Sequence, residues 1–467
     1  MKRLFGVFVI VFLTINLPAQ TASDDTQDKI KQLEAQVRSI LVELNKLKKT
    51  AKDPIQPAKV EVPTTAAVTT KQAETEKKLL GIEIGNDVRL TPYGILSFNA
   101  FGNSGGTNNA DVPIFATPTG TSNVSASVRQ TRLGLKIEGL RIGKARHNSI
   151  IEGDFFGGFP STSIGENFGV FRLRLAFVRL DWEKTSVTAG QDWMVFAPVN
   201  PVSMATAGNP QMAAAGNNWA RLPQVRIDYK LGTHVTWQGA VLAPRTGDFA
   251  TNAAFVIQPT SGAATRVPFL QTRITFTDKD WFGTKKAGSI GISGHYGRSR
   301  VFAGATNTPY DLNSDGIALD WNLPVVTRVT LLGEAFIGEN LGGFQAGIFQ
   351  SYNNDYARRV GSTLVPYGAK SIRTHGGWIQ MGFTPPIMKD RIGIYGSVGL
   401  DDPDNSDLVS LSHRDWRSRN LVFAGDIVYR FTPQFSLGAE FRRFQTNYYY
   451  SGRQKANHVY LAASYTF

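Results

Sequence analysis

The chain has 467 residues, 42% of them hydrophobic, and its lack of cysteine excludes disulfides, thiolate metal sites and cysteine redox chemistry. Its formal net charge of +13 is compatible with nucleic acid, a membrane surface or anionic solutes, and does not choose among these partners. After the N-terminus, no run of about eighteen residues lacks charges and polar breaks, which argues against a helical membrane protein.

The first 22 residues have the pattern of a secretory signal peptide. Lys2 and Arg3 form a basic start, an apolar run extends to about Leu13, and small residues follow at Ala19 and Ala22. A short membrane anchor is the alternative, but the apolar run is too short for it. Cleavage after Ala19 and cleavage after Ala22 both stay open, because neither position has a small residue three positions upstream.

Residues 28–49 have the heptad spacing of a coiled coil. Apolar residues recur at alternating intervals of three and four, at Ile30, Leu33, Val37, Ile40, Leu44 and Leu47. This mixture of β-branched residues and leucine does not select a dimer, and a trimer is compatible with it. An amphipathic helix packed on another surface is the alternative. Residues 50–80, rich in proline, threonine and lysine, then form a linker to the remainder of the chain, 81–467.

From residue 81 onward the dominant pattern is a period of two, which is typical of strands. In one segment, Leu133 and Leu135 belong to one face, whereas Arg132 and Lys136 belong to the other. Sixteen segments alternate in this way, near residues 88–101, 125–139, 147–156, 171–182, 186–193, 221–230, 233–242, 266–277, 287–298, 314–323, 327–340, 372–384, 391–400, 418–431, 435–447 and 455–467. The large domain is therefore expected to be all-β.

Short and long connections alternate between these segments. The long ones include 102–124, 194–220, 243–265 and 341–371. A transmembrane β-barrel has this asymmetry, with short periplasmic turns, long outer loops, an even number of strands and both chain ends on the periplasmic side. We therefore predict a 16-stranded antiparallel transmembrane β-barrel over 81–467, preceded by the short N-terminal coiled-coil helix.

A soluble β-sandwich is the alternative fold, but it would not place so many arginines, aspartates and glutamates on the polar face, as a water-filled lumen would. Aromatic residues also gather where segments meet turns, as in the girdles of barrels, at Trp182, Trp321, Phe383, Phe431, Phe435 and Phe467. The last strand would close the barrel against the first one. Its end, with Tyr465 and Phe467, resembles the C-terminal signal that the outer-membrane assembly machinery of bacteria recognises.

Several stretches resemble the DcaP-like trimeric porins. They are VRQTRLGLK at 128–136, AGQDWMVFAP at 189–198, RLPQVRIDY at 221–229, GEAFIGENLGG at 333–343 and GGWIQM at 376–381. The resemblance implies a homotrimer embedded in the outer-membrane lipid of a Gram-negative-type bacterium, with the coiled coil in the periplasm. It also implies passage of small, often anionic solutes.

The expected function is a porin: a water-filled channel for passive diffusion of small hydrophilic, anionic solutes such as carboxylates or phosphates. No enzymatic activity, cofactor or nucleic-acid partner is expected. A structural barrel that tethers the membrane to the cell wall through its coiled coil is the alternative function, and conductance separates the two. A barrel enzyme is not favoured, because no nucleophile–base pair stands out in the sequence.

Alternation assigns two sets of charged residues to the lumen. The basic set is Arg89, Arg132, Lys136, Arg172, Arg174, Arg226 and Arg273. The acidic set is Asp320, Glu334, Asp426 and Glu440. In a ring of strands the two sets would face each other, as a basic wall opposite an acidic wall. Arginine suits carboxylates and phosphates because it pairs with them bidentately. The alternative is that these arginines form structural pairs with nearby carboxylates and brace the wall.

Two further segments, 194–220 and 311–315, are candidates for a loop inside the lumen and for a calcium site. The connection 194–220 is almost uncharged and rich in alanine, proline and asparagine, so we expect it to fold into the lumen and narrow it. A surface loop or a trimer contact is the alternative. Asp311, Asn313 and Asp315 match the first half of a calcium loop, but the bidentate glutamate is missing, so we expect no metal site.

Overall fold

The structure, a computed structural model, describes residues 81–84, 88–157, 169–204, 208–245 and 259–467. The predicted signal peptide, coiled coil and linker lie outside the described residues. In the part of the chain that is described, no helix is long and apolar enough to cross a membrane.

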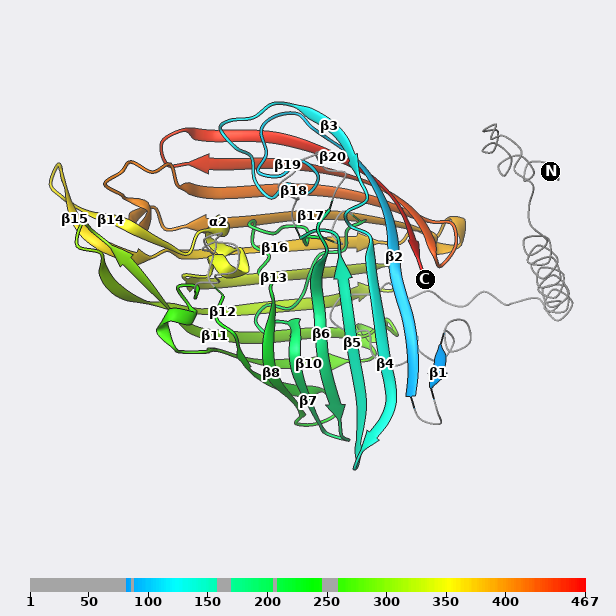
Figure 1. Cartoon of the computed structure of the whole chain (residues 1–467). Coiled ribbons are helices and arrows are strands. Elements are labelled where there is room, and N and C mark those ends of the chain that lie inside the picture. Colours follow the sequence, from blue (N-terminus) through cyan, green and yellow to red (C-terminus); the bar gives the residue numbers. More distant parts are fainter. Residues whose placement is uncertain (1–80, 85–87, 158–168, 205–207, 246–258) are drawn as a thin grey trace, which may run out of the picture. The chain divides into compact units, whose positions relative to one another are not determined.

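Within the described residues, sixteen antiparallel strands form one closed barrel (Figure 1). They are β2 (Val88–Asn103), β4 (Arg132–Ile142), β5 (Ala145–Asp154), β6 (Arg172–Asp181), β7 (Thr185–Trp193), β8 (Arg221–Lys230), β9 (Val235–Leu242), β10 (Phe269–Asp278), β11 (Gly288–Ala303), β12 (Thr308–Val326), β13 (Val329–Glu339), β16 (Arg373–Phe383), β17 (Ile392–Pro403), β18 (Arg417–Arg430), β19 (Phe435–Tyr448) and β20 (Gly452–Thr466). Each strand pairs with the next along the chain, and β20 pairs with β2. The sixteen-stranded antiparallel barrel predicted from the alternation is confirmed.

One predicted segment differs from the structure. Residues 125–139 are not one strand, because a turn closed by the bond from Thr131 N to Val128 O separates the short β3 (Asn123–Ser127) from β4. Both pieces pair with β2, β3 with its end and β4 with its start. The turn directs Arg129 and Gln130 into buried positions, which a continuous strand would not do. The three-residue β1 (Ile82–Ile84) also pairs with the start of β2.

The seam between β20 and β2 is bonded along its whole length. The register extends from His458 opposite Asn103 to Thr466 opposite Ile95. Beyond it, Phe467 N donates to Gly94 O at 3.1 Å and Gly94 N donates to Phe467 O at 3.0 Å. The predicted closing strand is therefore confirmed, and the assembly-signal role of Tyr465 and Phe467 stays a prediction.

The outer wall of the barrel is apolar and the inner wall is polar. On β2, for example, Leu96 and Phe98 are exposed on the outside, whereas Ser97 and Asn99 are buried on the inside. Exposed aromatic side chains stand at the ends of strands, at Trp182, Phe383, Phe431 and Phe435. A closed barrel with this distribution is the architecture that satisfies every backbone group inside a lipid bilayer.

The two ends of the barrel differ in their connections. At the short-turn end they are 143–144, 182–184, 231–234, 279–287, 327–328, 384–391 and 431–434. At the long-loop end they are 104–131, 155–171, 194–220, 243–268, 304–307, 340–372, 404–416 and 449–451. Two connections at the long-loop end, 304–307 and 449–451, are nevertheless short. Successive connections therefore lie at opposite ends of the barrel, as the prediction requires. The predicted alternation of short and long connections does not hold for every loop.

The connection 340–372 contains a hairpin that the sequence did not reveal. Its strands are β14 (Tyr352–Val360) and β15 (Thr363–Ser371), and it projects beyond the long-loop end (Figure 1). Asp407 in the 3-10 helix η8 (Asn405–Leu408) fixes its base. The carboxylate is fully buried and binds Lys370 Nζ at 2.5 Å and Arg373 Nε at 2.8 Å. Burial raises the pKa of Asp407, but the hydrogen bonds from Arg373 and Lys370 outweigh this and lower its pKa below the ordinary value.

Replacing Asp407 with asparagine is expected to release the hairpin from the barrel rim. The neutral amide cannot form either ion pair, so Lys370 and Arg373 lose a charged hydrogen-bond partner. Trypsin should then cleave after the exposed Arg358 or Arg359 about tenfold faster at neutral pH. Limited proteolysis followed by mass spectrometry measures this rate.

The matched control is Asp404→Asn, because Asp404 also contacts Arg373, at 2.7 Å, but is partly exposed. An equal acceleration by this control would contradict the role of Asp407. Because the pKa of Asp407 is lowered on folding, its stabilisation is present at neutral pH and is lost only as the pH falls through the lowered value. In strong acid the wild-type hairpin should therefore be cleaved about as fast as the hairpin of Asp407→Asn. Pepsin, which is active in acid, measures both rates.

Candidate functional site

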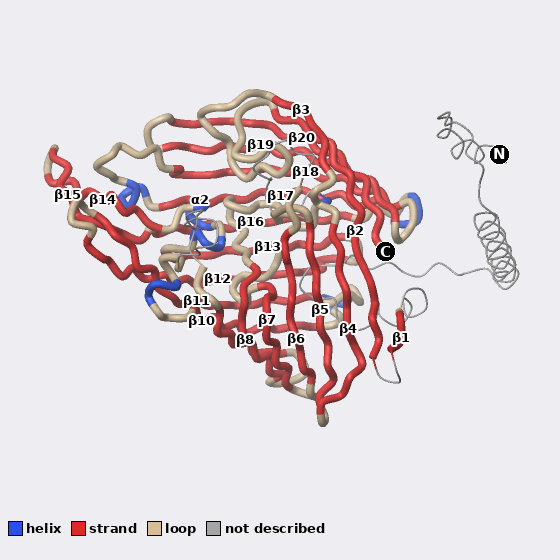
Figure 2. The backbone as a smooth tube through the Cα atoms, in the orientation of Figure 1, coloured by secondary structure: helices blue, strands red, loops and turns tan. Residues whose placement is uncertain are grey.

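The connection between β7 and β8, residues 194–220, is called the inner loop, and its described parts, 194–204 and 208–220, lie inside the ring of strands (Figure 2). Its first part binds the wall at β10 and β11. Val195 N and Phe196 N both donate to Gln271 Oε1, at 3.0 and 3.1 Å, and Ala197 N donates to Ser293 Oγ at 3.1 Å. The predicted in-folding of this loop is confirmed by these bonds to inward-facing side chains.

The middle of the inner loop reaches strands from the far end of the sequence. Gln380 on β16 binds both backbone groups of Val202, since its Oε1 accepts from the amide at 2.8 Å and its Nε2 donates to the carbonyl at 2.9 Å. The Ser203 hydroxyl donates to the Glu440 carboxylate on β19. The loop therefore crosses the lumen instead of following the strands that carry it.

The return half of the inner loop binds two more carboxylates. Gln211 Nε2 donates to Asp426 Oδ2 at 3.0 Å, and Asn218 donates to Glu334 Oε1 through its side chain at 2.9 Å and its backbone at 3.1 Å. Uncharged amide and hydroxyl donors thus satisfy carboxylates that the loop itself covers. This explains why the loop is long, uncharged and rich in asparagine and glutamine donors.

The predicted acidic wall is consequently covered. Glu334, Asp426 and Glu440 belong to the inward face of their strands, as expected, but their exposed fractions are only 1%, 3% and 4%. The expectation that they line open water is wrong, because the inner loop lies between them and the lumen. Their charges serve to hold the loop.

Arg273 and Asp320, assigned to opposite walls, are paired with each other. Their side chains form a bidentate ion pair, with Arg273 Nη2 2.6 Å from Oδ1 and Nε 3.0 Å from Oδ2. The two residues stand on β10 and β12, and the guanidinium crosses the intervening β11 at Gly291, where a Cβ atom would lie 2.6 Å from Nη2. The glycine therefore makes room for a bridge that alternation alone does not reveal.

The basic wall is built on β4 to β6. Arg172 binds Asp154 through two bonds of 2.7 and 3.0 Å, and Arg174 binds both Glu152 and Asp154 at 2.7 Å. Arg132 lies 3.6 Å from Glu152. The structural Arg–carboxylate pairs considered as the alternative are therefore present.

A bulge extends the ladder of arginines. The register between β5 and β6 shifts by one residue at Arg174, so that Arg179 faces inward further along the strand, in addition to Arg172 and Arg174. Arg179 then binds Asp228 at 3.0 Å, and Arg226 binds Asp228 at 3.2 Å. Strict alternation missed Arg179 because it cannot anticipate a bulge.

The basic wall differs from the acidic wall in its exposure. In the pair of Arg172 and Asp154 the side chains are 26% and 0% exposed, and in that of Arg132 and Glu152 they are 16% and 6% exposed. The carboxylates lie behind the guanidinium groups. In these two pairs water in the lumen therefore contacts mainly the cation, whereas Arg174 is 4% exposed and Arg226 and Asp192 are equally exposed, at 11%.

The two remaining predicted basic residues lie near the short-turn end of the lumen. Arg89 on β2 is half-buried and stands opposite Glu138 on β4. Lys136 is also half-buried, and its Nζ lies 5.2 Å from the centroid of the Tyr93 ring.

Two other loops also reach the lumen, which the sequence did not reveal. Ile114 and Phe115 of the connection 104–131 and Ile348 of 340–372 form one buried cluster with Trp219 of the inner loop. Asn420 Nδ2 on β18 donates to the Ile114 carbonyl at 2.9 Å. Three loops therefore meet in the lumen, in an apolar contact that holds them together.

Arg221 is a further residue that alternation missed. It stands at the start of β8, where the inner loop joins the wall, and is 8% exposed. Its guanidinium carbon lies 4.9 Å from the ring centroid of Trp193 and 5.2 Å from that of Trp219. This cation–π contact fixes the return of the inner loop to the wall.

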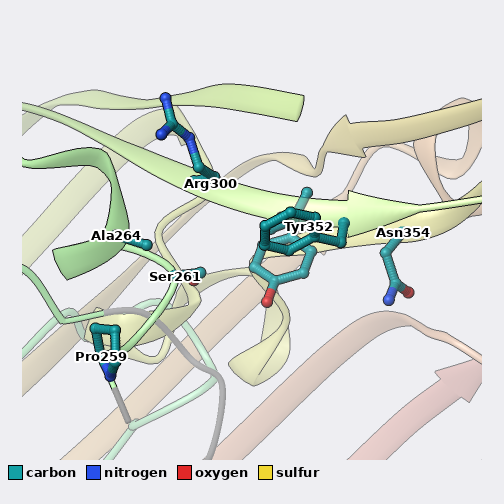
Figure 3. A pocket seen from close by; sticks show the side chains of 8 residues that line it. Pro259, Ser261, Ala264, Arg300, Tyr352 and Asn354 are labelled. Atoms are coloured by element: carbon teal, nitrogen blue, oxygen red, sulfur yellow. The ribbon is translucent and has the colours of Figure 1, made fainter. Parts of the chain in front are cut away.

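A cavity of about 460 Å³ lies at the long-loop end (Figure 3). Its lining includes Pro259, Ser261, Ala264, Arg300, Tyr352 and Asn354. It is formed by residues 259–264, the end of β11 and the hairpin strand β14. Its lining contains no residue of the basic wall or of the inner loop.

The candidate calcium residues do not form a loop. Asp311, Asn313 and Asp315 lie along β12, and Asp311 pairs with Arg300 at 2.7 Å. An extended strand spreads these side chains along one line, whereas a calcium loop wraps its ligands around the ion. Among the described residues, no group of three or more histidine, cysteine, aspartate or glutamate side chains could hold a metal.

Comparison with solved structures agrees with this architecture. The outer membrane channel DcaP of Acinetobacter baumannii is similar with a TM-score of 0.62 and 19% identity, over 83% of this chain and 100% of that chain. The chain has the fold of that channel. OmpF of Salmonella typhi, in complex with daunomycin, is similar with a TM-score of 0.52 and 12% identity, over 83% and 100% of the two chains. The resemblance to the DcaP-like porins is therefore confirmed for the fold. No protein-family model and no curated protein matches the sequence.

Replacing Gln380 with leucine is expected to detach the middle of the inner loop. Val202 would lose both backbone partners, at a cost of about 1–3 kcal/mol for the unsatisfied groups. Single-channel recordings in planar bilayers should then show a larger and noisier conductance than the wild type.

The control is Gln224→Leu, because Gln224 is equally an inward-facing glutamine but binds the carbonyls of Asp192 and Trp193 on the adjacent strand. This variant should conduct like the wild type. A Gln380→Leu channel with unchanged conductance would show that the inner loop does not set the width of the pore.

Proposed function

We propose that the protein is a porin, a water-filled channel of the bacterial outer membrane for passive diffusion of small hydrophilic solutes, with a preference for anions such as carboxylates or phosphates. The observation that carries this proposal is the unequal covering of the two walls. The inner loop covers the carboxylates of β13, β18 and β19, while Arg132, Arg172 and Arg179 on the opposite wall stay partly exposed. The fold shared with an outer-membrane channel supports the placement in the membrane.

The exposed guanidinium groups supply a physical basis for anion preference. Arginine donates hydrogen bonds in a planar fork that matches carboxylate and phosphate oxygens. The paired carboxylates reduce the net charge of the wall but hold the guanidinium groups in fixed positions. A transiting anion can therefore exchange weak contacts along the wall from Arg172 to Arg226 without being trapped by an unpaired charge.

The remaining parts of the proposal concern assembly. The N-terminal 22 residues would direct export, and the assembly machinery of the outer membrane would recognise the end of β20 at Tyr465 and Phe467. Three copies would associate, with residues 28–49 as a coiled coil in the periplasm and 50–80 as the spacer. The support for these parts is the sequence pattern, since residues 1–80 lie outside the described ones.

A barrel that tethers the membrane to the cell wall is the second candidate function, and the heptads of 28–49 favour it. The two functions differ in what the lumen must do. A tether has no use for a ladder of partly exposed arginines fixed by bidentate pairs, and this ladder is why we favour the channel.

Replacing Arg172 with glutamine is expected to lower the anion-to-cation permeability ratio about twofold. One charge roughly 8 Å from a passing ion contributes about 0.5 kcal/mol in water, and the neutral amide removes it. The reversal potential of reconstituted channels in a salt gradient measures the ratio.

The matched control is Arg298→Gln, because Arg298 on β11 belongs to the outward face of the barrel and should not affect permeation. An unchanged reversal potential in Arg172→Gln would contradict the anion filter. A wild-type protein that inserts in bilayers and never conducts would favour the tether.

A further inference from the structure

One turn of the inner loop, at residues 210–217, lies directly against the wall formed by β16, β17 and β18. Met212, Ala214 and Ala215 in this turn are buried, with exposed fractions of 3%, 0% and 0%. Met212 and Ala215 belong to one apolar cluster with Trp378 of β16. No water therefore separates this part of the loop from the strands.

At Gly399 on β17 the backbone of the loop touches the wall without an intervening side chain. A Cβ atom at this position would lie 2.2 Å from Ala215 O and 2.9 Å from Met212 Sδ. On the adjacent strand β16, the backbone of Gly377 is equally close, since a Cβ atom on Gly216 of the loop would lie 2.2 Å from Gly377 O. Cβ atoms do not approach other heavy atoms within 3.0 Å, so a side chain at position 399 requires the loop to move.

Hydrogen bonds on both sides of Gly399 hold the turn at this short distance. Ser397, two residues earlier on β17, donates to Gln211 Oε1 at 3.0 Å. Asn420 on β18 donates to Ala214 O at 2.8 Å. The turn cannot slide along the wall without breaking these bonds, so a side chain at position 399 would push it away from the wall and into the lumen.

The direction of this movement is towards the arginines. In the ring of sixteen strands, β16 and β17 stand opposite β6 and β7. The inner loop also reaches the basic wall, where Arg172 on β6 donates to Gly208 O at 2.7 Å. The loop thus lies between the two sides, and a turn displaced from β17 narrows the space in front of the basic wall.

We propose that Gly399 determines the size of the solute that the channel admits. Its lack of a side chain lets the inner loop lie on the wall and leaves the rest of the lumen open. Alanine at this position would displace the turn by roughly 1 Å, which restores ordinary van der Waals contact. Gly399 acts through the loop and is therefore a positioning residue. This inference rests on the proposed function, because a size limit has a meaning only in a conducting channel.

The test compares Gly399→Ala with the wild type in planar bilayers and in liposome swelling with neutral sugars of increasing size. A displacement of about 1 Å in a constriction several ångströms wide should lower the ion conductance by on the order of a fifth. Entry of a disaccharide should be slowed about threefold more than entry of a monosaccharide, because the larger sugar is closer to the size limit. The anion-to-cation permeability ratio should not change, because no charge is altered.

The matched controls are Gly396→Ala and Gly438→Ala. Gly396 is also on β17, but a Cβ atom there would have no atom within 4 Å. At Gly438 on β19, a Cβ atom would lie 2.4 Å from Met204 Sδ, which is the end of a flexible side chain and can rotate away. Both variants should conduct and admit sugars like the wild type.

A second variant, Gly216→Ala, introduces a clash at the neighbouring contact with Gly377 and leaves the strands unchanged, so it should narrow the pore in the same way. It decides by the same criteria if Gly399→Ala does not insert in the bilayer.

Unchanged conductance and sugar entry in Gly399→Ala would overturn the inference, as would equal changes in Gly396→Ala. A larger and noisier conductance would also overturn it, because the loop would then be detached and not displaced. A wild-type protein that never conducts would refute the proposed function. A conducting wild type with an unaffected Gly399→Ala would refute this inference alone.

Discussion

Backbone hydrogen bonding without an open edge is the constraint on which the rest of this structure depends. In lipid, an unpaired strand would leave a row of amide and carbonyl groups without partners, so the sheet has to close on itself. The seam from Gly94 and Phe467 to Asn103 and His458 provides that closure. Once the ring is closed, successive side chains of each strand face the lipid and the lumen in turn. This alternation decides which residues of the strands point into the lumen.

The lumen then has to accommodate many inward charges, and the inner loop divides them. On one side its amide donors cover Glu334 and Asp426, where buried carboxylates need hydrogen-bond partners. On the other side, arginines stand in front of the carboxylates that fix them, as Arg172 does with Asp154. The lumen thus exposes more positive than negative charge in this region. The reason is the different burial of the two kinds of side chain, and not the composition of the wall.

Much of the fold follows from local patterns, whereas much of the site follows from contacts between distant residues. Period-two alternation placed all sixteen strands, and the composition of 194–220 predicted that it enters the lumen. Alternation could not reveal the bulge at Arg174, the bridge from Arg273 across Gly291 to Asp320, or the apolar contact of Phe115 with Trp219. Each of these depends on a register shift or on an encounter between loops, which no single segment of sequence encodes.

The attachments of the inner loop also have a consequence for the order of folding. Val202 and Gln380 are 178 residues apart in the chain, and Ser203 and Glu440 are 237 residues apart. Such non-local contacts cannot form until the C-terminal strands are in place. Bringing the two ends of a long segment together costs conformational entropy, and the favourable contact energy is gained only afterwards. The middle of the inner loop therefore becomes fixed late, and a chain that stalls before β19 would lack both the closing seam and the carboxylate that Ser203 binds.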